Sequence, residues 1–272
     1  MSFRLTFTIG EQSYEIGNIH DISIPLSFNG PQPNTYGVPT AQSKPYEGQG
    51  FIGDVKQGGS CNFEQYTFIP HCNGTHTEGA GHLTASTLPI HHILKESFFP
   101  ATLISVPLTD IQHSPDSYQP SLEKKDRFVD RKALEIALEG ISDQWLQALV
   151  IRTLPNSEEK KERNYMKGTC PFFSNEAMEF IREKKIQHLL MDFPSVDRLF
   201  DEGRLSNHRI FWGMPTSGHM LPQENDQGKT LTEMVFVADH IGDGHYLLEI
   251  QLAAFMSDAS PSRPRLLTWE NT

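Results

Sequence analysis

The chain has 272 residues, of which 37% are hydrophobic and 21% are charged, and its formal net charge at pH 7 is −11. This length is sufficient for a sizeable hydrophobic core, and the negative charge argues against nucleic acid or an anionic membrane surface as a partner. The beginning of the chain does not resemble a signal peptide, no stretch has the length of a membrane span, and three cysteines do not make a disulfide framework. We therefore expect a protein of the reducing cytoplasm.

The N-terminal part of the chain predicts strands. Alternating apolar residues predict two strands at 4–9 and 13–16, joined by a tight turn, and a third extended segment at 21–26. Residues 28–59 are rich in Gly, Pro, Asn and Gln, which predicts a long loop that acts as a lid or a subunit contact. Residues 61–69 predict a further strand.

The run that follows carries most of the functional information in the sequence. Residues 70–82 read Pro-His-Cys-Asn-Gly-Thr-His-Thr-Glu-Gly-Ala-Gly-His, with three histidines, one cysteine and one glutamate. In an extended strand Cys72, His76 and Glu78 would project from the same side, and Gly74 would leave room for an ion. Sulfur, nitrogen and oxygen donors of this kind bind divalent first-row metals. The spacing predicts a metal site with these three residues as ligands.

The remaining histidines of this run have different expected places. The glycines before His82 turn the chain, which would put His82 just beyond the metal, where a general base belongs. On strand geometry His71 points to the opposite face, so we do not expect it to replace Cys72 as a ligand. The alternative interpretation is a polar turn with incidental histidines, but five donor residues in so short a run favour the metal site.

The rest of the chain predicts strands with a few helices between them. We expect strands at 101–108, 146–153, 186–192, 232–238 and 246–256, helices at 131–141 and 175–185 with Ser174 as N-cap, and loops at 110–130 and 155–167, the latter charged and solvated. This mixture predicts an α+β or mixed α/β fold. No linker divides the chain, so we expect one domain over residues 1–272.

Three downstream elements add candidates for the site. The segment 192–197 ends a strand and serves either as a helix cap or as a functional element. His208, taken alone, would be an ordinary core or surface histidine. Glu233 precedes an apolar run, where an unpaired carboxylate is costly and calls for a cation or a metal. If His208 and Glu233 converge on Glu78, a second ion would lie about 3.5–4 Å from the first.

The run at 72–82 resembles the hallmark of the cyclase-like metal-dependent hydrolases, the family of bacterial kynurenine formamidase and isatin hydrolase. That hallmark is His-x-Gly-Thr-His-x-Asp-x-Pro-x-His, and the chain departs from it at Cys72, Glu78 and Ala80. The resemblance continues over most of the chain, at Asp21-Ile22-Ser23, Arg152-Thr153, the segment 192–197, His208, Glu233 and the segment 260–263.

The resemblance implies a swivelling β/β/α-type fold with a central mixed sheet or barrel and outer helices. It implies one or two divalent ions held by five residues, Cys72, His76, Glu78, His208 and Glu233, with His82 as the catalytic acid and base. A cysteine ligand would favour Zn²⁺ over Mn²⁺. The expected reaction is hydrolysis of an amide-type C–N bond in an N-formyl or cyclic amide. The alternatives are a lactone or ester hydrolase and a non-catalytic metal- or ligand-binding protein.

The family also suggests partners. The expected partner of the site is a small-molecule substrate, and family members suggest a homodimer or homotetramer.

Overall fold

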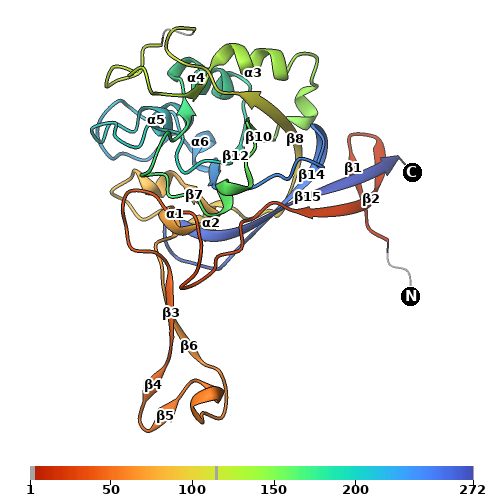
Figure 1. Cartoon of the computed structure of the whole chain (residues 1–272). Coiled ribbons are helices and arrows are strands. Elements are labelled where there is room, and N and C mark those ends of the chain that lie inside the picture. Colours follow the sequence, from red (N-terminus) through yellow and green to blue (C-terminus); the bar gives the residue numbers. More distant parts are fainter. Residues whose placement is uncertain (1–3, 114–115, 272) are drawn as a thin grey trace.

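The computed structural model describes residues 4–113 and 116–271, which form a mixed sheet with short helices around it (Figure 1). The main sheet has nine strands in the order β1-β2-β15-β14-β8-β10-β12-β13-β7. Their bounds are β1 Thr6–Ile9, β2 Gln12–Asp21, β7 His76–Gly79, β8 Phe98–Pro107, β10 Ala148–Leu154, β12 His188–Met191, β13 Thr230–Glu233, β14 Gly244–Leu252 and β15 Ala259–Asn271.

Seven of these strands close into a barrel, because β15 pairs with β7 as well as with β14. The strands β8, β10, β12 and β13 are parallel to one another, and the remaining neighbours in the ring are antiparallel. The hairpin of β1 and β2 extends the sheet from the outer edge of β15. This architecture confirms the predicted fold class, a mixed sheet closed as a barrel with helices outside.

Alternation along the strands divides the core into two layers. On β10, Ala148 and Val150 belong to a cluster of strand and loop residues inside the barrel, whereas Leu149 and Ile151 belong to a cluster shared with the helices. The helices are α1 Pro70–Asn73, α2 Ile90–Ile93, α3 Arg131–Ala137, α4 Asn175–Glu183, α5 Ser206–Phe211 and α6 Glu224–Gln227. Short 3₁₀ turns lie at Val55–Gln57, Ala80–His82, Asp143–Trp145 and Glu158–Lys161. Among the described residues, none of these helices has the length and apolar character that a bilayer crossing requires.

The predicted helix at 175–185 is confirmed as α4. The side chain of Ser174 accepts the backbone N–H of Ala177, as an N-cap does. Ala177, Met178 and Ile181 are fully buried between the barrel and the neighbouring helices. The helix therefore forms because its cap and its apolar stripe agree.

The expected loop at 28–59 is in part an arm that projects from the barrel (Figure 1). Strand β3 (Gln42–Pro45) pairs with β6 (Glu64–Thr67), and β4 (Glu47–Gly48) pairs with β5 (Phe51–Ile52) beyond them. Apart from the arm, two further short strands, β9 (Phe128–Val129) and β11 (Phe172–Phe173), pair with each other beside α4. The prediction of a loop was wrong for the residues of β3, β4 and β5, where cross-strand aromatic contacts, such as Tyr46 with Phe63, stabilise the arm.

Three other expectations differ from the structure. Residues 70–73 form a helical turn rather than a strand, because proline is well suited to a first helical position and disrupts a ladder. The predicted strand at 232–238 ends at Glu233 as part of β13. The strand β15 was not predicted at all, since its two prolines and two arginines obscure the pattern. The single-domain organisation stays a prediction.

Candidate metal centre

Strands β7 and β13 present the first three site residues. His76 and Glu78 are two residues apart on β7, and Glu233 lies directly opposite His76 in the antiparallel register with β13. Residues with this relation share one face of the sheet. Thr77 points to the other face, where its hydroxyl contacts that of Thr232 at 2.8 Å. The three side chains therefore lie on the outer wall of the barrel, and His76 Nε2 is 3.3 Å from Glu233 Oε2.

Helix α5 brings the fourth residue to this wall. His208 is buried, and its Nε2 lies 3.2 Å from Glu78 Oε1. Its other ring nitrogen, Nδ1, donates to Asp197 Oδ2 at 2.6 Å, and the same carboxylate accepts the backbone N–H groups of His208 and Asn207. A carboxylate behind a histidine fixes both the tautomer and the ring orientation. Asp197 thus aims Nε2 of His208 at Glu78.

The helical turn α1 changes the places of His71 and Cys72. His71 Nε2 lies 3.3 Å from Glu78 Oε2, so the expectation that His71 faces away was wrong. A helical turn does not alternate faces as a strand does, which is why the period-two argument failed here. Cys72 is buried, but its sulfur does not join any of the close groups of ligand atoms found among the described residues.

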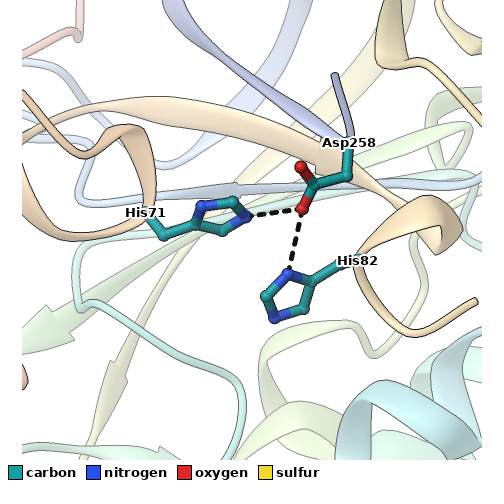
Figure 2. Close-up of side chains that lie close together, drawn as sticks. All are labelled: His71, His82 and Asp258. Atoms are coloured by element: carbon teal, nitrogen blue, oxygen red, sulfur yellow. Dashed lines mark hydrogen bonds and ion pairs between the residues drawn. The ribbon is translucent and has the colours of Figure 1, made fainter.

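A 3₁₀ turn places His82 next to these residues. Its ring stacks on that of His71 with centroids 4.6 Å apart, and its Nδ1 lies 3.9 Å from Glu78 Oε2. The same nitrogen is 3.2 Å from Oδ2 of Asp258, a residue between β14 and β15 (Figure 2). Sequence reasoning missed Asp258, because its place depends on the pairing of β15 with β7. The only local signal was its position just before the segment 260–263.

The ligand atoms form three groups within the described part of the chain. Each group has three atoms within 4.8 Å of one another, and the groups are His76 with Glu78 and Glu233, Glu78 with His82 and His208, and His71 with His82 and Asp258. Glu78 belongs to the first two groups and His82 to the last two. The structure therefore brings together His76, Glu78, His82, His208 and Glu233.

Two observations show that the inner residues fit a metal ion. Nε2 of His76 and Oε1 of Glu233 are buried and have no hydrogen-bond partner, although buried polar atoms are almost always paired. In addition, Glu78 and Glu233 are two buried carboxylates facing the same space, which is costly without a positive charge between them. A divalent cation satisfies both requirements with nitrogen and oxygen donors.

The electrostatics of the two carboxylates point the same way. Burial raises the pKa of Glu233, and the charge of Glu78 raises this pKa further, well above its usual range. For Glu78, burial opposes ionisation, but His82, His208 and His71 together hold the pKa below its usual value. Burial opposes the charged form of His208, but Asp197 and Glu78 raise its pKa well above normal. Protons on Glu233 and His208 thus occupy positions where a cation would bind.

A cavity of about 520 Å³ opens above this cluster. Tyr36, Pro194, Leu199 and Leu205 contribute to its wall, and Cys72, Glu78 and His208 lie among its lining residues. Tyr36 has a φ of +52°, a strained conformation for a residue other than glycine. Burial and the charge of Glu233 raise the pKa of its hydroxyl, which keeps the hydroxyl protonated. Sequence reasoning gave no sign of Tyr36, since it lies in the long segment read as a loop.

Comparisons with known proteins give a family for the chain and solved structures that share its fold. The Cyclase family model, described as "Putative cyclase", matches residues 20–198. The kynurenine formamidase of Bacillus cytotoxicus is 26% identical over 214 residues, which cover 76% of this chain and 81% of that protein. A solved structure described as a predicted metal-dependent hydrolase from Bacillus stearothermophilus aligns with a TM-score of 0.58 at 15% identity, over 92% of this chain and 98% of that one. Isatin hydrolase A from Labrenzia aggregata aligns with a TM-score of 0.59 at 13% identity, over 93% and 94%.

The family match covers well over half of the chain, so the chain belongs to the Cyclase family. The solved structures share its fold. The matched range contains β7 and Asp197 but ends before His208 and Glu233, which the fold brings to the same place.

Proposed function

We propose that the protein is a metal-dependent hydrolase that cleaves an amide-type C–N bond in an N-formyl or cyclic amide. The observation that carries the proposal is the buried contact of His76, Glu78, His208 and Glu233, with unpaired ligand atoms, at the base of a cavity. The similarity to a kynurenine formamidase and the shared fold with isatin hydrolases support the choice of bond.

In this proposal His76, Glu78, His208 and Glu233 hold one or two divalent ions, with Cys72 as a fifth ligand. Glu78 belongs to two groups of ligand atoms, so it would help to hold an ion in either group. The chemistry that such ions supply is a bound water with a pKa lowered to about 7 and a polarised substrate carbonyl. Zn²⁺ is favoured over Mn²⁺ if the Cys72 sulfur is a ligand, because thiolates select softer metals.

His82 moves the proton in this proposal. Asp258 is an acceptor, so Nδ1 of His82 carries the proton in their 3.2 Å contact and leaves Nε2 as the basic nitrogen. Nε2 takes a proton from the attacking water and later donates it to the leaving nitrogen. Asp258 is the positioning residue of this step, because it sets the tautomer and the orientation of the His82 ring.

The cavity wall supports a small planar substrate. The ring of Tyr36 and the side chains of Leu199 and Leu205 are apolar surfaces beside the acid–base and ligand residues. The protonated hydroxyl of Tyr36 can donate a hydrogen bond to a substrate carbonyl. An aromatic or heterocyclic amide matches this combination of apolar wall and polar base.

The substitution His76→Ala tests the proposed function. We expect the purified variant to lose bound metal, measured by elemental analysis, and to lose hydrolysis of N-formyl aromatic amines and cyclic imides. His113→Ala, at an exposed histidine, is the matched control and should behave as wild type. Unchanged metal content and unchanged hydrolysis in His76→Ala would contradict the proposal. Hydrolysis of lactones alone, or metal binding without any turnover, would favour the two alternative functions.

We also propose that the protein is a cytoplasmic homodimer or homotetramer. The arm exposes Phe63 and Tyr66, each with 54% of its surface accessible, which supports contact with a second copy. The three free cysteines support a reducing compartment. The molar mass measured by light scattering for wild type and for Phe63→Ser with Tyr66→Ser would test the assembly, and a monomeric wild type would contradict it.

A further inference from the structure

The outer group of His71, His82 and Asp258 is not explained by the inner metal centre. Figure 2 shows one nitrogen of each imidazole ring close to a single oxygen, Oδ2 of Asp258. His71 Nε2 lies 3.0 Å from this oxygen and His82 Nδ1 lies 3.2 Å from it. Neither His71 nor Asp258 was among the residues expected to bind metal; His71 comes from α1 and Asp258 from the segment between β14 and β15.

The contact of His71 is not an ordinary hydrogen bond. Its Nε2 is buried and lacks a hydrogen-bond partner, even though Asp258 Oδ2 is only 3.0 Å away and Glu78 Oε2 is 3.3 Å away. The atoms are close, but an N–H group at Nε2 of His71 would not point at either of these two oxygens. Ligand atoms around a common ion have this relation, because their lone pairs converge on the ion rather than on one another. Ligands about 2.0–2.2 Å from a divalent metal are themselves separated by about 3–3.5 Å.

The outer group differs from the inner centre in its access to solvent. The side chains of His71, His82 and Asp258 are 26%, 29% and 34% exposed. The side chains of His76, Glu78 and His208 are between 0% and 3% exposed. An ion bound in the outer group can therefore exchange with solvent more easily than an ion of the inner centre.

We propose that His71, His82 and Asp258 form an outer binding site for a divalent first-row metal ion, separate from the inner centre and weaker than it. Two imidazole nitrogens and one carboxylate oxygen are donors that Zn²⁺ binds well. Glu78 lies on one side of the group, with Oε2 3.3 Å from Nε2 of His71, and the partly exposed side chains leave access for water from the other. The site adjoins the inner centre, because His82 belongs to both groups.

Occupancy of the outer site has a consequence for catalysis, which rests on the proposed function. A metal ion at Nδ1 of His82 would take the place of the proton there. It also removes the hydrogen bond by which Asp258 orients the ring. The proposed general base is then disabled, so excess metal inhibits the enzyme whose inner centre needs the same metal.

The test of the site is the binding of Zn²⁺ at controlled free concentrations. We would dialyse the purified holoprotein against zinc buffers and measure bound zinc per chain by elemental analysis. For wild type we expect one zinc equivalent per chain in addition to the tightly bound zinc, and we expect this further equivalent to bind more weakly. In Asp258→Asn and, independently, in His71→Gln, the tight zinc remains and the dissociation constant of the further equivalent rises at least about tenfold.

The matched control is Asp110→Asn. Asp110 contacts His113 at 2.7 Å on the surface, and no third ligand joins this carboxylate–histidine pair among the residues that the structure describes. Its loss should leave both classes of zinc unchanged. The proposal is overturned if wild type lacks the further equivalent, if the equivalent persists in both variants, or if the variants lose tight zinc instead. That last outcome would make His71 and Asp258 ligands of the inner centre.

The inhibition is measured on hydrolysis of the best amide substrate. The wild-type rate should fall at the free zinc concentration at which the weakly bound zinc ion occupies the outer site. The rate of His71→Gln at this concentration should be the same as its own rate at low zinc. An active enzyme that fills the weak equivalent without losing rate would overturn the inhibitory role. A protein that binds the weak equivalent but hydrolyses no substrate would count against the proposed function and still support the outer site.

Discussion

At the scale of single residues, Asp197 is the side chain on which the position of His208 depends. It is fully buried and accepts hydrogen bonds from the ring and backbone of His208, from the backbone of Asn207 and from the hydroxyl of Tyr118. Four donors are thus satisfied by two oxygens. An amide in the same place would turn one acceptor into a donor facing other donors.

We expect Asp197→Asn to weaken metal binding about 10- to 100-fold, because the ring of His208 loses its anchor. Competition with a chromogenic chelator measures this change. Tyr118→Phe is the control, since it removes one donor to Asp197 without altering the contact to His208. Metal binding by Asp197→Asn as tight as that of wild type would contradict the anchoring role.

A second residue, His188, links stability to pH. It is buried, its Nδ1 contacts the hydroxyl of Thr230 at 2.9 Å, and its ring packs on Phe99. Burial lowers its pKa from 6.5 to about 4. As the pH is lowered, His188 of the unfolded chain takes up its proton first, at about pH 6.5. The contribution of neutral His188 to the free energy of unfolding is therefore fully present above about pH 6.5 and is lost as the pH falls toward 4. The loss amounts to about 2 kcal/mol at pH 5.

The substitution His188→Gln removes this titration. We would measure the free energy of unfolding of both proteins by urea denaturation at pH 7.5 and pH 5. Between these two pH values, we expect it to fall by about 2 kcal/mol less in the variant than in wild type. Comparing the two proteins separates His188 from the other histidines, which titrate in both. Equal pH dependence of the two proteins would show that His188 is not held neutral by the fold.

Residue identities at the site could be predicted where the local geometry is regular. His76 and Glu78 share a face because 76–79 is a strand, and an isolated Glu233 indicates that a cation is needed. His71 and Asp258 could not be predicted. The first depends on a helical turn that begins at Pro70, and the second on a register between strands about 180 residues apart along the chain.

At the scale of elements, the 3₁₀ turn Ala80–His82 must pass close to the segment at Leu88. A Cβ on Gly81 would lie 2.4 Å from the backbone oxygen of Leu88. Backbone atoms cannot move aside as a flexible side chain does. We therefore expect Gly81→Ala to lower the free energy of unfolding by roughly 1–3 kcal/mol and to displace His82.

Chemical denaturation and hydrolysis rates would measure both effects. Gly228→Ala is the control, because its Cβ would meet no atom within 4 Å and its φ of −80° suits alanine. That change should be neutral or stabilise by up to about 1 kcal/mol. If Gly81→Ala is as stable as Gly228→Ala, the turn is not as tightly held as the structure indicates.

Elements with an uninterrupted apolar run were predictable, and those that depend on neighbours were not. Strands β8, β10 and β12 lie within or near their predicted ranges because both of their faces are buried. The charges of segment 155–167 predict a solvated loop, but Lys160 is buried and donates to Asp192 at 2.7 Å. A lysine in a charged run gives no sign that a buried carboxylate at the end of another strand pairs with it.

At the scale of the whole molecule, the metal centre depends on contacts between segments that are far apart along the chain. His76, Glu78 and Glu233 meet when β7 pairs with β13, and His208 reaches Glu78 from α5, so the full set of residues is assembled only in the folded chain. The metal thus binds the folded chain and has no comparable site in the unfolded one. A ligand of this kind stabilises the fold by mass action, about 2.7 kcal/mol at a free concentration 100 times the dissociation constant.

We expect removal of the metal with a chelator to lower the melting temperature of wild type by several degrees, at roughly 2–4 °C for each kcal/mol. Glu233→Gln should respond differently. In the metal-free protein burial and the charge of Glu78 raise the pKa of Glu233 so that its carboxyl holds a proton, and glutamine imitates that form. The metal-free variant should therefore melt at the temperature of metal-free wild type.

With metal present the two proteins should separate, because glutamine is a poor ligand and the variant gains little from the ion. Scanning fluorimetry of both proteins, with chelator and with added Zn²⁺, gives the four melting temperatures. A variant that is destabilised equally under both conditions would mean that Glu233 supports the fold rather than a cation. A rise in melting temperature with added Zn²⁺ that occurs only in wild type would show that the ion on the outer wall stabilises the barrel.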